Sequence, residues 1–300
     1  MRVAILALMI LAAPSLRAAE PAVSESTRAV LVTGASTGIG RYVTEKLAAS
    51  GYFVYAGARK DADLAALNAI RNVQALRLDV TKQEDVDAAL ATITKAGRGL
   101  YGLVNNAGIA TPGLFADASL QEIDLQMQVN VYGPVRMTKA FLPLLLESKG
   151  RITNIGSISG VLASKDLNAY AMTKHAMEAF TDSLAVELAP RGVIVNIVEP
   201  GNFNSEIGAS ATKRTGQQTR FTDRSKYKQP DEVAAAVELA LFEPNPKRRY
   251  MVTPDQREAE FTIRKQIEQL VQLNERQPYS YDRDALVKML DEALKPAPPK

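Results

Sequence analysis

Residues 29–40 read AVLVTGASTGIG, and this stretch decides the fold. Its apolar start predicts a buried strand, and the glycines after it predict a tight turn that opens a helix. Such a turn lets backbone N–H groups approach a pyrophosphate, and the helix N-terminus adds partial positive charge. The stretch therefore predicts a dinucleotide-binding loop, whereas the alternative is a plain glycine-rich turn between a strand and a helix. The loop residues expected to bind the dinucleotide are Gly34, Ser36, Gly38, Ile39 and Gly40.

Apolar runs and helical patterns alternate along the rest of the chain. Strands that alternate with helices of about ten or more residues predict a parallel sheet with helices on both faces. The fold class is therefore α/β, a Rossmann-type doubly wound parallel sheet of about seven strands. We expect strands at 29–33, 53–56, 73–78, 100–104, 151–155, 193–198 and 249–252, and helices up to Gly51 and at 61–70, 83–96, 120–146 and 230–242.

Three segments depart from this regular alternation. We expect the helix at 120–146 to be interrupted at Gly133-Pro134 and again at Pro143, because proline removes a helix hydrogen bond. Residues 202–229 are polar and irregular, and a loop of that length is usually functional or mobile. Beyond it, the patterns at 258–274 and 282–294 predict two amphipathic helices. We therefore expect one domain at 28–253, followed by a C-terminal helical extension at 254–300.

Composition narrows the function classes. The 300 residues are 46% hydrophobic and 23% charged, which is ordinary globular composition, and the net charge of +3 gives no reason to expect nucleic acid binding. The chain has no cysteine, so disulfides and thiolate metal sites are excluded. The single histidine, His175, cannot build a histidine-based metal cluster. We expect no metal.

The first 27 residues have the composition of a targeting segment. Arg2 precedes an apolar run from Val3 to Ala13, and small residues follow it. This order is typical of a secretory signal, and the alternatives are an uncleaved anchor or a wrongly assigned start. The run is too short to span a bilayer comfortably. Export conflicts with the cofactor supply that a dinucleotide enzyme needs, so the sequence leaves the location open between export or membrane attachment and the cytoplasm.

Tyr170 and Lys174 form a candidate proton-transfer pair. Residues four apart on a helix point to the same face, and a cation beside a phenol favours the phenolate. This is what a reaction that moves a proton to or from an alcohol oxygen requires. Tyr42 and Lys46 have the same spacing without any chemical context, so spacing alone is weak evidence. The helix that holds Tyr170 is expected to run to about residue 188.

Several motifs together resemble the short-chain dehydrogenase/reductase family, in its compact single-domain branch. The resemblance covers about residues 28–252, and its motifs occur in the family's order and at similar separations. The matching residues are Thr33 to Gly40, Asp79-Val80, Asn105 to Gly108, Asn130, Ser157, Tyr170 with Lys174, and Pro200-Gly201.

The resemblance implies a role for each catalytic position. Tyr170 would be the general acid/base, and Lys174 would favour the ionised phenol and hold the nicotinamide ribose. Ser157, at the end of the fifth strand, would hydrogen-bond the substrate oxygen. Asn130 would hold a water that links Lys174 to solvent. Taken alone, Ser157 could instead cap a turn, and Asn130 could be a polar residue inside a helix.

Cofactor choice depends on the end of the second strand. An acidic residue there would bind the ribose hydroxyls and repel a 2′-phosphate, but Ala58 takes that position and Arg59 follows it. NADP is therefore favoured over NAD, although Arg59 could be a surface charge and Thr37 stands where many NADP-binding members carry a second basic residue. The resemblance implies further cofactor contacts from Asp79, Val80, Asn105, Asn106, Ala107, Gly108, Pro200, Gly201 and Ser205.

The sequence thus predicts an NADP-dependent oxidoreductase that interconverts an alcohol and a carbonyl. A non-catalytic dinucleotide sensor and an NAD-preferring hydroxysteroid- or retinol-like dehydrogenase are the alternatives, and an epimerase or dehydratase of the larger branch fits poorly. Substrate choice is expected to lie in residues 111–118, 160–168 and the loop after Gly201. Leu114, Phe115, Val161 and Leu162 favour an apolar small-molecule substrate, although core packing would also explain them. The family resemblance implies a homodimer or homotetramer.

Overall fold

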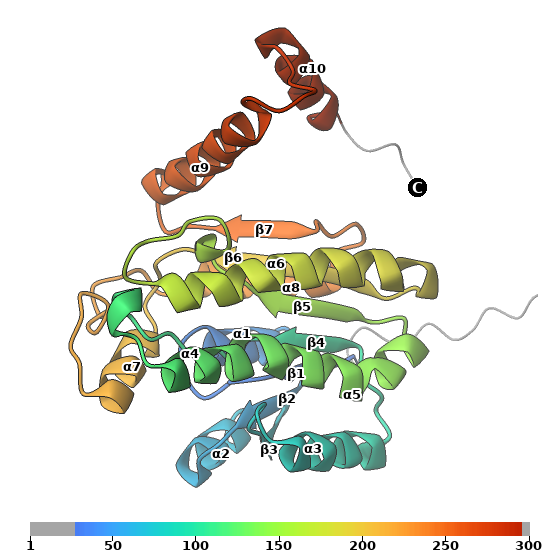
Figure 1. Cartoon of the computed structure of the whole chain (residues 1–300). Coiled ribbons are helices and arrows are strands. Elements are labelled where there is room, and N and C mark those ends of the chain that lie inside the picture. Colours follow the sequence, from blue (N-terminus) through green and yellow to red (C-terminus); the bar gives the residue numbers. More distant parts are fainter. Residues whose placement is uncertain (1–27, 296–300) are drawn as a thin grey trace, which may run out of the picture.

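A single parallel sheet organises the molecule. The structure, a computed structural model, describes residues 28–295 (Figure 1). Seven strands lie in the order β3-β2-β1-β4-β5-β6-β7, and every neighbouring pair is parallel. This confirms the predicted fold class. The strands are β1 (Ala29–Val32), β2 (Phe53–Ala58), β3 (Val73–Arg77), β4 (Gly102–Asn105), β5 (Arg151–Ile155), β6 (Ile194–Pro200) and β7 (Arg249–Val252).

Helices cover both faces of the sheet. Successive side chains of a strand point to opposite faces, so Val30 packs with one set of helices and Leu31 with the other. The first set is α1, α2 and α8, and the second is α3, α5 and α6. The helices are α1 (Gly38–Ala49), α2 (Asp61–Asn68), α3 (Gln83–Ala96), α4 (Leu120–Met127), α5 (Gly133–Glu147), α6 (Asn168–Leu188), α7 (Ile207–Thr215), α8 (Asp231–Phe242), α9 (Gln256–Asn274) and α10 (Arg283–Ala293).

The helical segment from α4 to α5 agrees with one predicted interruption and corrects the other. The α-helix gives way to one π-helical turn, Gln128–Tyr132, and α5 begins at Gly133. Pro134 lies in the first turn of α5, a position that tolerates a missing N–H. Pro143 lies inside α5, yet the helix continues to Glu147 because Phe141 and Leu145 are buried against the sheet. Tertiary packing therefore outweighs the local cost of the proline.

The polar segment after β6 corrects a second prediction. It contains α7, although no helix was expected there. Only Gly208 and Ala211 of this helix are buried, so its apolar pattern is too sparse to be recognised in the sequence. A Cβ atom on Gly208 would lie 1.6 Å from the carbonyl oxygen of Phe221, which shows how closely the helix packs on the chain that follows it. The signal that could have revealed α7 is its end, where Gly216 adopts a left-handed conformation.

The C-terminal extension projects away from the sheet, past the edge strand β7 (Figure 1). Both predicted helices are present as α9 and α10, with bounds within two residues of those expected. Thr262 is the buried residue of α9, and α10 has none, so the extension touches the domain mainly through the start of α9. Within residues 28–295, no helix has the length and apolar character needed to cross a membrane. The predicted N-terminal signal or anchor lies outside the described residues.

Candidate active site

The candidate site lies at the carboxyl ends of the central strands. β1 has β2 on one side and β4 on the other, so successive crossovers leave β1 in opposite directions and a crevice opens between them. In open parallel sheets, ligands bind in such a crevice. The loops that follow β1, β4, β5 and β6 meet there. Nearly all of the predicted site residues belong to these four loops or to the helices that follow them.

The glycine loop after β1 has no room for side chains. Gly34 has a positive φ of 64°, and a Cβ there would lie 2.9 Å from Cα of Ala107. A Cβ on Gly40 would lie 2.3 Å from both the Gly34 carbonyl oxygen and Nδ2 of Asn106. Glycine is therefore required for the loop after β1 and the loop after β4 to pack together. Ser36 is half-buried beside them, and Gly38 and Ile39 open α1.

Hydrogen bonds tie these two loops together. Asn106 donates from Nδ2 to the carbonyl oxygens of Thr33 (2.8 Å) and Gly34 (3.0 Å). The Thr33 hydroxyl accepts from the backbone N–H groups of Asn106 and Ala107, both at 3.0 Å. The loops thus form one unit whose shape does not depend on a ligand. A preformed backbone turn of this kind can bind a pyrophosphate without a further ordering cost.

Asn105 has a different position from its neighbours. Its side chain is 3% exposed and donates to Oδ1 of Asn154 (2.9 Å) and to the Thr138 hydroxyl (3.3 Å). Asn154 in turn donates to the Thr181 hydroxyl at 2.9 Å. This buried polar chain links β4, β5, α5 and α6 beneath the crevice. Asn105 therefore supports the site from within the core, while Asn106, Ala107 and Gly108 form the loop above it.

The ends of β2 and β3 carry the residues expected at the adenosine half. Arg59 follows β2, its side chain is 66% exposed, and its nearest carboxylate oxygen belongs to Asp79 at 3.9 Å. Asp79 accepts from the backbone N–H (3.0 Å) and the hydroxyl (2.7 Å) of Thr81, which fixes the turn after β3. Val80 is buried against Gly133. The exposed Arg59 guanidinium remains available to an anionic group.

Asn130 lies in the π-helical turn between α4 and α5. Its Oδ1 accepts from the N–H of Ile109, and its Nδ2 donates to the Ile109 carbonyl, both at 2.8 Å. Nδ2 also donates to the Thr173 hydroxyl at 3.0 Å. The side chain therefore fixes the loop after β4 to α6, one residue before Lys174. π-Helical turns are frequent at functional sites, and this one places an asparagine 2% exposed at the base of the crevice.

Ser157 follows β5, and its contacts are compatible with both roles considered for it: capping a turn and hydrogen-bonding a substrate oxygen. Its hydroxyl accepts from the N–H of Ser159 at 3.0 Å, so it does cap the short turn that follows. The same hydroxyl contacts the carbonyl oxygen of Pro200 at 3.5 Å, beside the end of β6. Because 3.5 Å is a long contact, the hydroxyl is free to turn towards a ligand.

Tyr170 and Lys174 lie on one face of α6, as their spacing predicts. Nζ of Lys174 lies 5.5 Å from the centre of the Tyr170 ring and donates to the carbonyl oxygen of Ile155 at 2.8 Å. This bond anchors the 6% exposed ammonium at the end of β5, next to Ser157. By contrast, Tyr42 bonds to Gln229 (3.0 Å). Context, not spacing, distinguishes the two tyrosine–lysine pairs.

The loop after β6 closes the crevice from the other side. Gly201 donates its N–H to the Val252 carbonyl at 2.8 Å, which orders the chain after Pro200. A Cβ on Gly38 would lie 3.2 Å from Cβ of Ser205, so this loop reaches the glycine loop. A cavity of about 200 Å³ lies between them and is lined in part by Ser205 and Tyr42.

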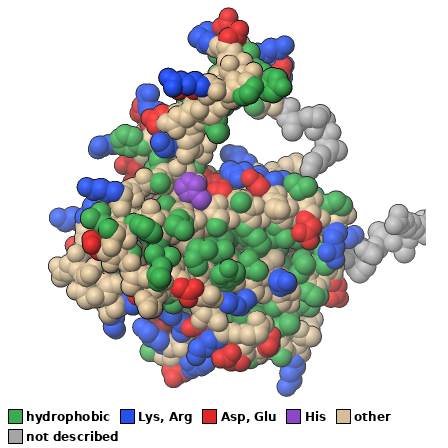
Figure 2. Space-filling view, in the orientation of Figure 1, with side chains coloured by type: hydrophobic (Ala, Val, Ile, Leu, Met, Phe, Trp, Pro, Cys, Tyr) green, Lys and Arg blue, Asp and Glu red, His purple; other side chains and the backbone are tan. Residues whose placement is uncertain are grey.

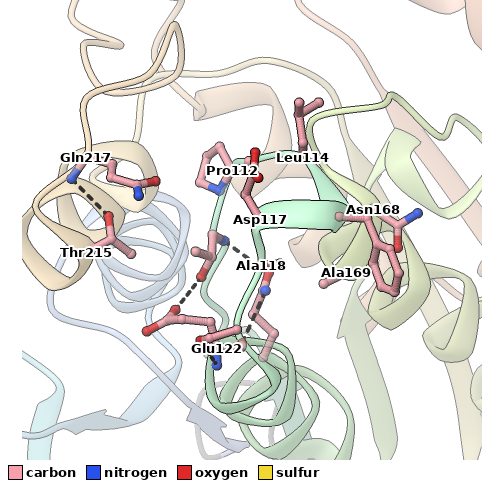
Figure 3. A pocket seen from close by; sticks show the side chains of 14 residues that line it. Pro112, Leu114, Asp117, Ala118, Glu122, Asn168, Ala169, Thr215 and Gln217 are labelled. Atoms are coloured by element: carbon pink, nitrogen blue, oxygen red, sulfur yellow. Dashed lines mark hydrogen bonds between the residues drawn. The ribbon is translucent and has the colours of Figure 1, made fainter.

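A larger cavity of about 260 Å³ lies beside the first turn of α6. Figure 3 shows Thr215 and Gln217 on one side of it and Asn168 and Ala169 on the other. Leu114 and Phe115 line it and are half or more exposed, whereas Val161 is buried in the core and Leu162 is half-buried. Three loops enclose this region. Gly113 bonds to Asp166 (3.0 Å), Asp166 pairs with Arg220 (2.9 Å), and Arg214 pairs with Glu122 (3.2 Å).

The structure also places charged residues at the site that the sequence did not reveal. Glu178 and Glu199 face each other below the Ser157 turn, and burial raises the pKa of both carboxyls, that of Glu199 to about 7. Arg224 lies in the loop after β6, and Glu258 begins α9 against Gly201. Two weak signals existed: Glu178 lies two turns after Tyr170 on α6, and Glu199 directly precedes Pro200-Gly201.

Fold and site together define an α/β protein with a glycine loop of the nucleotide-binding type and a tyrosine–lysine pair at the sheet's carboxyl edge. A model of the short chain dehydrogenase family matches residues 28–216. The chain belongs to the short chain dehydrogenase family.

Known proteins support this assignment. The mitochondrial D-beta-hydroxybutyrate dehydrogenase of Rattus norvegicus is 39% identical over 188 residues, which are 59% of this chain and 55% of that protein. The chain therefore spans little more than half the length of this relative. An NADPH-dependent 3-dehydrocapnine reductase of Ornithobacterium rhinotracheale is 34% identical over 76% of this chain and 88% of its own length. A short-chain dehydrogenase structure from Streptomyces avermitilis has a TM-score of 0.73 at 32% identity, covering 84% of this chain and 97% of that one.

Proposed function

We propose that this protein is an NADP-dependent oxidoreductase that interconverts an alcohol and a carbonyl, with Tyr170 as general acid/base. The observation that carries this proposal is the convergence of Ser157, Tyr170 and the anchored Lys174 at the sheet's carboxyl edge, beside a preformed glycine loop. A non-catalytic sensor would need the loop but none of these three side chains. A bound nicotinamide supplies the hydride, so the protein must orient the substrate and move one proton.

Each residue has a role that follows from its position. Ser157 donates a hydrogen bond to the substrate oxygen, which fixes the reacting carbon and polarises the C–O bond. Tyr170 gives its phenolic proton to that oxygen in reduction and takes it back in oxidation. The buried Lys174 stabilises the phenolate left behind, and it is held in place by Ile155. Asn130 holds α6 against the loop after β4. We also propose that Asn130 binds the water molecule that would connect Lys174 to solvent.

The cofactor preference rests on Arg59. No carboxylate follows β2 at the position where one would repel a 2′-phosphate, and the exposed guanidinium of Arg59 can pair with that phosphate. The bacterial 3-dehydrocapnine reductase is named as NADPH-dependent, which agrees with this assignment. The glycine loop, the turn at Asp79 and the loop after Pro200 would hold the remainder of the dinucleotide.

We further propose that the protein forms a homodimer or homotetramer. Apolar side chains gather on the face that carries α4, α5 and α6 (Figure 2). Leu120 on α4, Tyr132 in the π-helical turn before α5 and Val186 on α6 are all about half exposed or more. Contiguous apolar surface of this kind marks a contact between protein chains. Light scattering coupled to gel filtration measures the mass of the assembly, and a monomer at micromolar concentration would contradict the proposal.

The test is a substrate panel with NADPH and NADH, measured for wild type, Tyr170→Phe and a control. The panel holds secondary alcohols, ketones and the oxo acid 3-oxobutanoate, because one relative is named for beta-hydroxybutyrate. Tyr170→Phe should lower kcat by at least about 100-fold, because the general acid is lost. The matched control is Tyr101→Phe, whose ring stacks on Phe242 away from the crevice and should retain activity. Binding of NADPH without turnover of any substrate would favour the sensor instead.

A further inference from the structure

Arg224 is a cation inside the loop that closes the substrate region. Its Nη2 donates to Oδ1 of Asn202 at 3.0 Å, and its guanidinium carbon lies 4.9 Å from the centre of the Tyr227 ring. Its strongest electrostatic neighbours are Tyr170, Tyr227 and Glu258. Electrostatics therefore couple the guanidinium to the phenol that we assign as general acid/base.

Arg224 differs from the other arginines of this loop in having no counter-ion. Arg214 pairs with Glu122 at 3.2 Å, and Arg220 pairs with Asp166 at 2.9 Å. Within residues 28–295, no carboxylate lies within ion-pair distance of Arg224. Its Nε is buried and has no hydrogen-bond acceptor. Burial lowers the pKa of this guanidinium, which is the expected response of a cation removed from water without a partner.

The surrounding residues fix the orientation of Arg224. Glu258 accepts two hydrogen bonds from Asn202, one from its backbone N–H and one from its Nδ2, both at 2.8 Å. The amide of Asn202 can therefore present only its oxygen to Arg224. This contact and the Tyr227 ring hold the guanidinium, and its charge has no ion-pair partner within residues 28–295. Such a cation is built to accept an anion, because arginine pairs with carboxylates through two parallel hydrogen bonds.

We propose that Arg224 binds a carboxylate on the substrate, so that the protein acts on oxo acids and hydroxy acids. This inference rests on the proposed alcohol–carbonyl reaction and adds the substrate class to it. The substrate carboxylate supplies the counter-ion that Arg224 lacks among the described residues. A fixed carboxylate also places the reacting carbonyl relative to Tyr170 and Ser157, because both ends of the substrate are then held. The exposed Leu114 and Phe115 are left to contact an apolar remainder.

The first experiment compares an acid with its uncharged counterpart. Wild-type protein is assayed with NADPH and either 3-oxobutanoate or its methyl ester, and the same pair is repeated with 3-oxooctanoate. We expect kcat/KM for the acid to exceed that for the ester by at least about tenfold. Arg224→Met should lower kcat/KM for the acid by about 30- to 100-fold, mainly through KM, and change the ester by less than about threefold. Arg224→Lys should show an intermediate loss, because lysine keeps the charge but not the fork.

Two controls separate anion binding from a structural role. Lys226→Met removes a positive charge from an exposed residue of the same loop and should leave both substrates unchanged. Thermal unfolding of the proteins saturated with NADP⁺ gives a readout without turnover, because the oxidised cofactor has no hydride to transfer to an oxo acid. Here 3-oxobutanoate should raise Tm of wild type and not that of Arg224→Met, while the ester should shift neither.

The outcomes separate the two proposals. Equal kcat/KM for acid and ester in wild type, or equal losses for both in Arg224→Met, would overturn the carboxylate assignment while the alcohol–carbonyl reaction stands. A Tm shift by the acid that needs Arg224, without Tyr170-dependent turnover, would keep the anion site and overturn the reaction. Arg224→Lys keeps the positive charge. If this variant lost turnover and the Tm shift as completely as Arg224→Met, recognition of the substrate by charge would also be contradicted.

Discussion

The carboxyl pair Glu178 and Glu199 should make the stability of this protein depend on pH. Glu199 ends β6 with 5% exposure, and Arg249 reaches both carboxylates, at 3.1 Å from Glu178 and 3.5 Å from Glu199. One oxygen of each carboxyl has no hydrogen-bond donor. A proton shared between the carboxyls of Glu178 and Glu199 would give these two oxygens a hydrogen bond. Arg249 also pairs with Asp182 at 2.7 Å, and Arg248 lies 3.6 Å from Asp182, so one arginine cannot neutralise both buried carboxylates.

The sign and the size follow from linkage. Burial first, and the negative charge of Glu178 second, raise the pKa of Glu199 from 4.5 to about 7. A carboxyl with a raised pKa in the folded state is more easily protonated there than in the unfolded chain. Its stabilising contribution is complete below about pH 4.5 and is lost as the pH rises through about 7. The shift corresponds to at most about 3.5 kcal/mol between these limits, since each unit of pKa is worth about 1.4 kcal/mol.

The assay is urea unfolding of wild type and Glu199→Gln at about pH 5 and about pH 8. Glutamine resembles the protonated acid and can donate to Glu178, so the variant should match wild type near pH 5 and exceed its free energy of unfolding by about 1 to 3 kcal/mol near pH 8. Glu187→Gln, an exposed change on α6, should leave the wild-type pH dependence intact. Parallel curves for wild type and Glu199→Gln would refute the reasoning, because they would show that Glu199 does not titrate between these pH values.

Two further predictions concern the dinucleotide. Arg59→Glu should raise KM for NADPH by at least about tenfold and lower KM for NADH. The reason is that a carboxylate at this position repels the 2′-phosphate and binds ribose hydroxyls. An unchanged ratio of the two KM values would show that Arg59 is only a surface charge. Gly40→Ala should weaken NADPH binding and lower the free energy of unfolding by about 1 to 3 kcal/mol, because the added Cβ would meet Asn106 and the Gly34 carbonyl at 2.3 Å. Fluorescence titration with NADPH measures the first effect, and urea unfolding measures the second. Wild-type values in both assays would contradict the packing argument.

The sequence predicts the sheet and the placement of Tyr170 beside Lys174 well, because both depend on local pattern. Short runs rich in β-branched and aromatic residues indicate strands, so β5 and β7 have the bounds expected. Tyr170 and Lys174 share one helix face, so their spacing defines their geometry once α6 is recognised. The same logic fails at Pro143. There, local propensity indicates a break, and the burial of Phe141 and Leu145 against the sheet decides otherwise.

Contacts between residues distant in sequence could not be predicted in this way. The bond between Asn202 and Glu258 joins residues 56 positions apart, and no periodicity records it. Arg224 looks like an ordinary surface arginine in an irregular polar segment until the fold brings it towards Tyr170. Asn105 and Asn106 are adjacent in one motif, yet the alternation of a strand sends the first into the core and leaves the second to bind the glycine loop.

The cation that we propose to bind the substrate carboxylate lies in a different part of the chain from the residues that carry the proposed chemistry. The family model matches residues 28–216, which include the glycine loop, Ser157, Tyr170 and Lys174. Arg224 and Glu258 both lie beyond residue 216, and Glu258 begins the helix that extends away from the domain. Because Glu258 orients Asn202, and Asn202 contacts Arg224, the C-terminal extension is linked to the substrate region through two hydrogen-bonded steps. Relatives that share the catalytic residues but differ after residue 216 should therefore share the reaction and differ in substrate.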